Sequence, residues 1–288
     1  MQSVQIQLTT KCNERCFMCR KYTWKSKEIP YNILSEKINK YADANFTFSG
    51  GDPLEYSELK ALTELLVKKN IRYQVFTNMN YNLTPAMEEF LQNAEYIQVS
   101  LDGSTEEIYN YVRRPIENGL MYVIHNIKRF RLKVKANCTV SNRNYFDVPN
   151  IYNLAKQLGV PIRFFPVHTH DDAMVTFEMY KRMEYKVLGE EPPEEIQKLR
   201  KLMLEGRPEF SSCWVKREHR VIDESGKEYP CCRAINDNGE DWGGKYSIDN
   251  LEDIENENIL YSFCKGCDRY IKFNTNKEKY KGKVGQYL

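Results

Sequence analysis

The chain has 288 residues, enough for one large α/β domain or for a domain with a small appendage. Its 42 basic and 40 acidic residues leave a net charge of +2, which argues against a basic surface for nucleic acid or an anionic membrane. The N-terminus lacks the basic and apolar regions of a signal peptide, and no apolar run approaches about 20 residues. We therefore expect a cytoplasmic protein with neither nucleic-acid nor membrane partners.

The first 19 residues contain the most informative motif. Residues 3–9 alternate apolar and polar side chains, which predicts a half-buried strand that leads directly into Cys12, Cys16 and Cys19. Three thiolates so spaced can ligate three irons of a [4Fe–4S] cluster and leave the fourth iron open to a non-protein ligand. The alternatives are ordinary thiols, or a zinc site that a distant fourth ligand completes.

Strands and helices alternate after this loop. The predicted strands are 45–48, 73–76, 96–101, 134–140 and 162–165. Helices are predicted at 31–42 and, from apolar stripes, at 120–127 and 151–158. Three more are predicted from their first residues: one capped by Ser57, one with Thr84 as N-cap and Pro85 at its first position, and one that begins with a capping box at Ser104–Glu107. Six alternations predict parallel strands joined by right-handed crossovers.

Polar residues and glycines follow several of these strands, at the carboxyl ends where chemistry collects in such folds. Besides the cysteine loop they are Gly50, Gly51, Asp52, Pro53, Asn78, Ser100, Asp102, Ser141 to Asn144, His168 and His170. Each has a structural alternative: the glycines could form a turn, Asn78 and Asp102 could be caps, and the histidines could be polar loop residues. Cys138 lies within a predicted strand, which favours a place in the core.

The composition changes after residue 170. Residues 174–204 are helical in pattern and charged, and we interpret 171–208 as a helical linker that follows a first domain at 1–170. Five of the nine cysteines lie in the predicted third domain, 209–288: Cys213, Cys231, Cys232, Cys264 and Cys267. Residues 220–228 are typical of a hairpin that turns at Glu224–Gly226. Since this segment is small for a core of its own, a metal would supply the missing cross-links.

Three of these motifs resemble the radical S-adenosylmethionine (radical SAM) superfamily. Cys12-x3-Cys16-x2-Cys19 is similar to the cluster loop of that family, Gly50-Gly51-Asp52-Pro53 to its Gly-Gly-Glu-Pro segment, and Ser100-Leu101-Asp102-Gly103 to its fourth strand ending in peptide- and sugar-modifying branches. The resemblance implies a partial (β/α)6 barrel. It also implies that SAM chelates the open iron of a cluster held by Cys12, Cys16 and Cys19.

The resemblance further assigns residues to SAM, and the chain departs from the family pattern at some of them. The implied SAM-binding residues are Met18, Gly50, Gly51, Asp52, Pro53, Asn78, Ser100 and Asp102. Met18 replaces the usual aromatic residue, Asp52 replaces a glutamate and is one methylene shorter, and Met79 stands where relatives often have glycine.

The C-terminal cysteines resemble the SPASM/twitch extension of the same superfamily. Cys213, Gly226 and Cys231 are spaced like its opening motif, and Cys264-x2-Cys267 can close the site. This implies one auxiliary [4Fe–4S] cluster on Cys213, Cys231, Cys264 and Cys267, and a zinc ribbon on the same thiols is the alternative. Cys232 is left over, as a substitute ligand or a buried thiol.

The function that the resemblance implies is reductive cleavage of SAM to a 5′-deoxyadenosyl radical, followed by hydrogen abstraction and oxidation of the substrate radical through the auxiliary cluster. A sugar or aminocyclitol is the expected substrate, because the segment before Cys12 is too short for a peptide-recognition domain. The electron donor would be a flavodoxin or ferredoxin. The alternatives are crosslinking or epimerisation of a ribosomally made peptide and, in a different class, a non-catalytic zinc-binding module.

Overall fold

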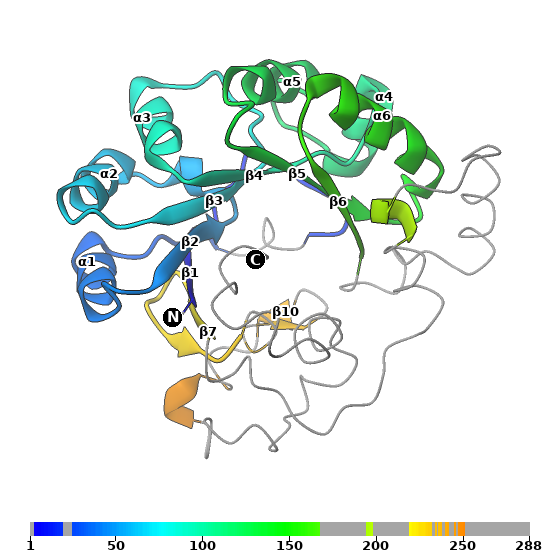
Figure 1. The fold of residues 1–288 in the computed structure, drawn as a ribbon. Coiled ribbons are helices and arrows are strands. Elements are labelled where there is room, and N and C mark those ends of the chain that lie inside the picture. Colours follow the sequence, from blue (N-terminus) through cyan, green and yellow to red (C-terminus); the bar gives the residue numbers. More distant parts are fainter. Residues whose placement is uncertain are drawn as a thin grey trace. The chain divides into compact units, whose positions relative to one another are not determined.

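The computed structural model of the protein describes residues 3–19, 25–167, 194–197 and 219–231, and also 234, 236–237, 240–241, 245 and 247–250. The chain forms two compact units, each with parallel strands and helices (Figure 1). The first comprises Met1–Lys11, Lys25–Val75 and Arg207–Leu288, and the second comprises Cys12–Trp24 and Phe76–Gly206. Within the described ranges, no helix is long and apolar enough to cross a membrane.

The first unit is organised around β1 (Ser3–Thr9), which pairs in parallel with β2 (Asn45–Gly50) on one edge and with β7 (His219–Ile222) on the other. The sheet continues from β2 to β3 (Tyr73–Thr77). The sequence predicts a half-buried β1, but all seven of its residues are buried, so both faces of this parallel strand are covered. Among its polar side chains, Gln5 donates through Nε2 to Ser49 Oγ at 2.8 Å.

The hairpin predicted near residue 224 is confirmed as β7 and the antiparallel β8 (Glu228–Tyr229). Asp223 closes its turn by accepting the Ser225 and Lys227 amides at 2.9 and 3.0 Å, and Gly226 adopts a φ of 84°. The pairing of β7 with β1 is not visible in the local sequence pattern. The predicted domain boundaries near residues 170 and 208 lie outside the described residues and stay predictions.

The α-helices described in the first unit are α1 (Tyr31–Lys40) and α2 (Leu59–Lys68), with the 3₁₀ helix η2 (Pro53–Glu55) between them in sequence. The predicted Ser57 cap is wrong: its hydroxyl donates to Glu28 Oε2 at 2.7 Å, and α2 starts without a side-chain cap. Further along the chain, β9 (Asn236–Asp237) pairs with β10 (Glu240–Asp241), and η6 spans Ile248–Asn250.

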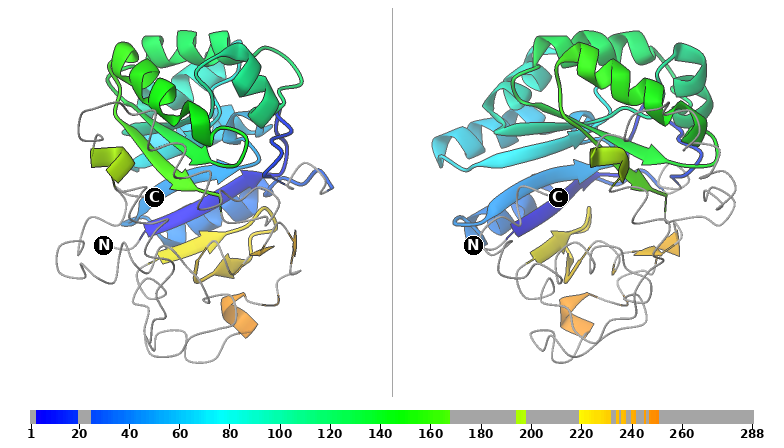
Figure 2. Two further views of the ribbon diagram at one scale, coloured as in Figure 1. Left: turned by 90° about the vertical axis from the view of Figure 1, so that its right-hand side faces the viewer. Right: turned by 45° about the vertical axis from the view of Figure 1, so that its right-hand side comes forward.

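The second unit contains the parallel strands β4 (Tyr96–Ser100), β5 (Val134–Val140) and β6 (Ile162–Pro166), paired in that order. Its helices are α3 (Pro85–Asn93), α4 (Glu106–Arg113), α5 (Leu120–Arg129), η3 (Tyr145–Asp147) and α6 (Val148–Leu158). The helices gather on one side of these strands (Figure 2). The six strands predicted from residue 3 to residue 165 are therefore all present.

The helix starts in the second unit follow local capping rules. Thr84 caps α3 by accepting the Met87 amide, as predicted, and Pro85 opens the helix. The helix predicted from the capping box does begin here as α4, but its N-cap is Thr105 and not Ser104. Thr105 accepts the Ile108 amide at 3.3 Å, whereas Ser104 Oγ donates to Asp147 at 2.7 Å.

A buried carboxylate joins α1 to β8 in the first unit. Glu228 is 4% exposed and accepts hydrogen bonds from Lys37 and Lys40 at 2.8 Å and from the Tyr41 hydroxyl at 2.5 Å. Burial works to raise the pKa of Glu228, but the hydrogen bonds from these three side chains outweigh it, so the pKa is lowered.

We expect Glu228→Gln to lower the free energy of unfolding at pH 7, because the amide cannot pair with two ammonium groups. The difference from the wild type should shrink below about pH 4.3, the usual glutamate pKa, as the pH falls through the lowered pKa of the folded state. Urea unfolding at several pH values measures both effects. The matched control is Glu64→Gln, at an exposed ion pair, for which a change within about 0.5 kcal/mol is expected. A difference independent of pH would contradict the prediction.

Candidate active site

The cysteine loop, Cys12–Cys19, begins the second unit and is bound to the C-terminal end of α4. Phe17 N donates to Val112 O at 3.1 Å, and Arg15 N donates to Arg114 O at 3.0 Å. Just beyond the helix, Ile116 N donates to Asn13 O at 2.9 Å. The first two bonds satisfy carbonyl groups that a helix end leaves without intrahelical partners. The loop backbone is thus bonded to α4 and to the residues after it at three points.

The three thiols of the loop differ in exposure. Cys16 is buried at 7% exposure, Cys12 is half-buried and Cys19 is exposed. Burial raises the pKa of the Cys16 thiol well above its usual value, and the Arg113 guanidinium opposes that rise. A nearby permanent cation therefore favours the thiolate, which is the form that binds iron.

The donor chemistry of the loop fits an iron–sulfur cluster, which proteins hold through cysteine thiolates. In a cubane each cysteine ligates a different iron, so its thiolates surround the cluster and need not converge on one point. Three cysteines on one fixed loop meet that requirement and leave one iron without a protein ligand.

Glu14, between Cys12 and Cys16, is the centre of a buried polar network. It is 2% exposed, and its Oε2 accepts a hydrogen bond from Arg113 Nε at 2.7 Å and forms an ion pair with Nη2 at 2.7 Å. Its Oε1 accepts the Tyr109 hydroxyl at 2.5 Å. Arg113 also donates through Nη1 to Asp102 Oδ2 at 2.9 Å. The network therefore connects the cysteine loop, through α4, to Asp102, which follows β4.

The sequence did not suggest Glu14, Tyr109 or Arg113 as site residues. Glu14 and Arg113 are 99 positions apart, so no local pattern pairs them. One signal was available: Tyr109 and Arg113 are four residues apart on a predicted helix and therefore share one face. Asp102, which the sequence predicts for SAM, has both carboxylate oxygens engaged, with Arg113 and with the Thr139 amide at 2.7 Å. Its SAM role stays a prediction.

The turn after β3 brings Asn78 to the cysteine loop. Asn78 Nδ2 lies 2.7 Å from Asn13 Oδ1 and 3.7 Å from Cys12 Sγ. Met79 follows with a φ of 57°, a left-handed conformation that glycine adopts more readily than methionine. Asn80 is fully buried and donates to Glu14 at 3.4 Å. Asn78 is therefore placed beside a predicted cluster ligand.

In the first unit, Gly50 and Gly51 pack against the backbone that leads into Cys12. A Cβ atom on Gly50 would lie 2.4 Å from Thr9 O, and one on Gly51 would lie 2.1 Å from Lys11 O. Gly51 N donates to Thr9 O at 2.6 Å, and Asp52 N donates to Lys11 O at 2.7 Å. Only glycine permits this approach. The segment is thus required for the chain path before the loop, whatever it contributes to SAM.

The remaining predicted site residues have varied positions. Asp52 Oδ1 accepts the Leu54 amide at 3.0 Å and so caps η2, next to the buried Pro53. Ser100 is half-buried at the end of β4, and Met18 packs with Cys16, Val112 and Val167. Cys231 is half-buried just after β8. Cys213, Cys232, Cys264, Cys267, His168 and His170 lie outside the described residues.

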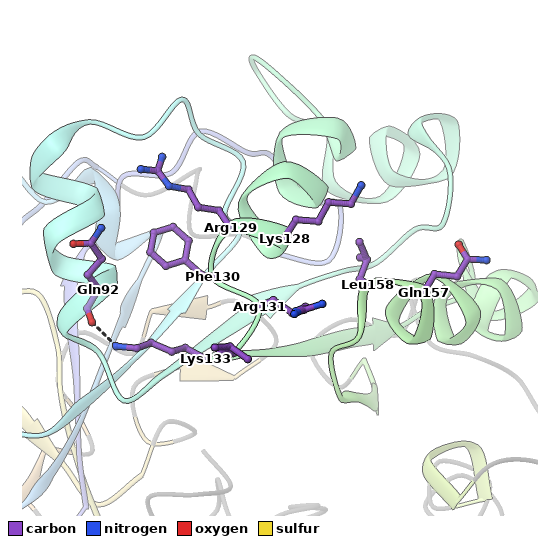
Figure 3. Close-up of a pocket in the computed structure, with 9 residues that line it drawn as sticks. Gln92, Lys128, Arg129, Phe130, Arg131, Lys133, Gln157 and Leu158 are labelled. Atoms are coloured by element: carbon purple, nitrogen blue, oxygen red, sulfur yellow. Dashed lines mark hydrogen bonds between the residues drawn. The ribbon is translucent and has the colours of Figure 1, made fainter.

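A separate hollow of about 620 Å³ lies at the opposite, amino-terminal end of β5 (Figure 3). Lys133 donates there to the carbonyls of Gln92 and Ala94, and Arg129 pairs with Glu88. In the same unit, the predicted site residue Ser100 lies instead at the carboxyl end of β4, and Asp102 follows it. This hollow is therefore distinct from the candidate site.

Comparison with known families decides the identity of the fold. The sequence profile described as "Radical SAM superfamily" matches residues 6–155, more than half of the chain. The chain belongs to the radical SAM superfamily. Radical SAM proteins use a [4Fe–4S] cluster and S-adenosylmethionine, as predicted from Cys12, Cys16 and Cys19. The auxiliary cluster and the twitch-like domain are not covered by this match.

Curated relatives of this radical SAM chain are distant. A probable GTP 3′,8-cyclase of Methanocaldococcus jannaschii is 25% identical over 171 residues, which cover 55% of the chain and 56% of the relative. The Fe-coproporphyrin III synthase of Methanosarcina barkeri is 26% identical over 168 residues, covering 54% and 41%. The chain spans about half the length of the curated relatives it matches.

Solved structures confirm the α/β radical SAM fold with a parallel sheet. Streptococcus suis SuiB bound to its precursor peptide SuiA aligns with a TM-score of 0.64 at 14% identity, covering 92% of this chain and 69% of SuiB. Native anSMEcpe with bound AdoMet and Cp18Cys peptide aligns with a TM-score of 0.63 at 17% identity, covering 93% and 86%. At these identities the likeness establishes the fold alone.

Proposed function

We propose that this chain is a radical SAM enzyme that removes a hydrogen atom from a polar substrate and oxidises the resulting substrate radical. The observation that carries the proposal is the Cys12–Cys19 loop, bound by its backbone to α4 and anchored by the buried Glu14–Arg113 pair. The cluster with bound SAM would supply a 5′-deoxyadenosyl radical as the hydrogen-abstracting group. The chain itself positions these groups and excludes water.

Individual residues have separate tasks in this proposal. Cys12, Cys16 and Cys19 hold the cluster, and Asn78, next to Cys12, orients a polar group of SAM. The other proposed SAM-binding residues are Met18, Gly50, Gly51, Asp52, Pro53, Ser100 and Asp102. Because Asp52 already caps η2 and Asp102 already binds Arg113, we assign to both a positioning role supported by their fixed rotamers.

The oxidation would use a second cluster on Cys213, Cys231, Cys264 and Cys267. Four thiolates leave no iron free to bind substrate, which favours electron transfer as its role. A flavodoxin or ferredoxin would reduce the first cluster. Such chemistry needs a reducing compartment, and we therefore place the protein in the cytoplasm.

Two substrate classes are candidates. We favour a small polar molecule such as a sugar or aminocyclitol, which the polar faces of the strands support. A ribosomally made peptide is the second candidate, because two of the structural neighbours are solved with peptides bound. Offering candidate sugars and candidate precursor peptides to the reduced enzyme, and following mass changes, separates the two.

The decisive test is SAM cleavage. Protein reconstituted anaerobically with iron and sulfide and reduced with dithionite should convert SAM to 5′-deoxyadenosine. Metal analysis should give about eight irons per chain for two cubanes. Zinc without sulfide would support a non-catalytic cysteine module instead. Absence of 5′-deoxyadenosine, with and without candidate substrates, would refute the proposed function.

We expect replacement of Cys12, Cys16 or Cys19 with alanine to abolish SAM cleavage, and Cys264→Ala or Cys267→Ala to retain cleavage but block product. The matched control is Cys138→Ala, which removes a thiol buried in the β5 core that has no place in either proposed cluster. Circular dichroism verifies folding of each variant. Full product formation by a Cys264→Ala, Cys267→Ala double variant would contradict the electron-acceptor role.

A further inference from the structure

The strands of the second unit have one apolar and one polar face. One face of β4, β5 and β6 presents buried residues such as Val99, Ala136 and Phe164. The opposite face alternates with them along each strand and is largely half-buried. Its members are Tyr96, Gln98, Ser100, Lys135, Asn137, Thr139, Arg163 and Phe165. We call these eight residues the polar strand face.

Strand register places the charged members side by side with amides. Lys135 is paired with Gln98, and Asn137 is flanked by Ser100 on β4 and Arg163 on β6. Two cations therefore lie on neighbouring strands, and the positive charge on Arg163 contributes to lowering the pKa of Lys135, after burial as the main cause. Lys135 Nζ lies 3.5 Å from the centre of the Tyr96 ring, and within the described part of the chain it forms no ion pair. A surface of this kind favours an anion.

Asn137 adds an acceptor without a donor. Its Nδ2 donates to Gln98 Oε1 at 2.9 Å, whereas its Oδ1 is buried and has no hydrogen-bond partner among the described residues. A buried carbonyl oxygen without a donor costs about 1–3 kcal/mol, and a ligand hydroxyl or amine would remove that cost. Since residues two apart on a strand are about 7 Å apart, this acceptor and Lys135 are separated by the length of a small polar molecule.

The polar strand face ends at the cysteine-loop network. Thr139, two residues beyond Asn137, donates its amide to Asp102, and Asp102 binds the Arg113 that pairs with Glu14. A molecule along this face therefore has one end toward the cations and the other toward the loop that holds Cys16. All of these residues belong to the second unit.

We infer that the polar strand face binds the substrate of the proposed reaction, and that this substrate is a polyhydroxylated or amino compound with a phosphate or carboxylate group. The anionic group is recognised by Lys135 and Arg163, and a hydroxyl or amine donates to Asn137 Oδ1. The inference rests on the proposed function and narrows it to an anionic substrate.

Calorimetric titration of the reconstituted holoenzyme with four probes tests the inference: glucose 6-phosphate, gluconate, glucose and inorganic phosphate. At least one of the two anionic sugars should bind at least tenfold more tightly than both glucose and inorganic phosphate. Lys135→Gln or Arg163→Gln should reduce this preference roughly tenfold. Lys128→Gln, which removes an exposed cation of α5, is the matched control and should change nothing.

Several outcomes would overturn the inference. If glucose binds as tightly as both anionic sugars, the polar strand face has no anion site. If Lys128→Gln reduces the preference for the anionic sugar as much as Lys135→Gln does, the preference reflects the net charge of the protein and not a specific site. If no probe binds and Lys135→Gln only lowers the melting temperature, the cations serve the fold and no ligand site exists. Cleavage of SAM by the wild type, measured separately, shows whether the proposed function itself has failed.

Discussion

Replacing Glu14 with alanine should lower the free energy of unfolding by about 3–5 kcal/mol. The substitution leaves the buried Arg113 guanidinium without the carboxylate that accepts from its Nε and pairs with its Nη2, and leaves the Tyr109 hydroxyl without its acceptor. Arg113 keeps its ion pair with Asp102, so the loss comes from the buried donors of Arg113 and Tyr109 that are left without an acceptor, at about 1–3 kcal/mol for each. Since whole domains are stable by about 5–15 kcal/mol, the loss should be evident in urea unfolding of the metal-free protein.

The matched control is Glu88→Ala. Glu88 also pairs with an arginine through both carboxylate oxygens, but the side chains are 26% and 44% exposed. Water replaces the lost partner at such a site, and the change should be below about 1 kcal/mol. If Glu14→Ala and Glu88→Ala lower the free energy of unfolding by similar amounts, burial of the Glu14–Arg113 pair does not determine its contribution to stability.

A milder variant separates stability from cluster assembly. Glu14→Gln keeps the side-chain shape and one acceptor oxygen, so we expect it to fold while holding the loop less firmly. Iron and sulfide content after reconstitution, together with the electron paramagnetic resonance spectrum of the reduced cluster with and without SAM, should then differ from the wild type. An unchanged iron content and spectrum would confine Glu14 to a purely structural role.

The second large effect is expected of Gly51→Ala. The added Cβ would meet Lys11 O at 2.1 Å and Thr10 O at 2.5 Å, and both are backbone atoms that cannot turn away. Relief requires separating the two segments, which breaks the bonds from Gly51 N to Thr9 O and from Asp52 N to Lys11 O. Overpacking and two lost hydrogen bonds together should cost about 3 kcal/mol or more in urea unfolding.

Gly159→Ala provides the comparison for that substitution. Gly159 has a φ of 70° at the end of α6, but a Cβ there would meet only Arg131 Cδ at 3.5 Å. Backbone strain alone should therefore cost about 1–2 kcal/mol. If Gly51→Ala is no worse than Gly159→Ala, the close approach at Lys11 is not a constraint. Iron content should fall only in the Gly51 variant, because Lys11 directly precedes Cys12.

Local patterns were sufficient for much of the fold and for the cysteine loop. The alternation in residues 3–9, the Thr84-Pro85 helix start and the turn at Glu224–Gly226 depend on neighbours in sequence, and all three are present in the structure. The loop cysteines were recognisable because their spacing is itself the chemical requirement. Even so, β1 is more buried than its pattern suggests, since burial depends on what the rest of the fold places over both faces of the strand.

Long-range pairings could not be predicted in the same way. The Glu14–Arg113 pair joins residues 99 positions apart, and the side chains of Ser57 and Ser104 found distant carboxylates in place of the helix amides nearby. The parallel pairing of β7 with β1 is likewise a tertiary property. In each case the interaction is made with a partner that is distant in sequence, and only the complete fold brings that partner close.

The hydrogen bonds from Phe17 and Arg15 to the last turn of α4 couple the cysteine loop to that helix. Cys16 lies between the two donors in sequence, so its position depends on the backbone path at Val112 and Arg114. A substitution that unwinds the last turn of α4 would therefore displace the loop without altering any thiol.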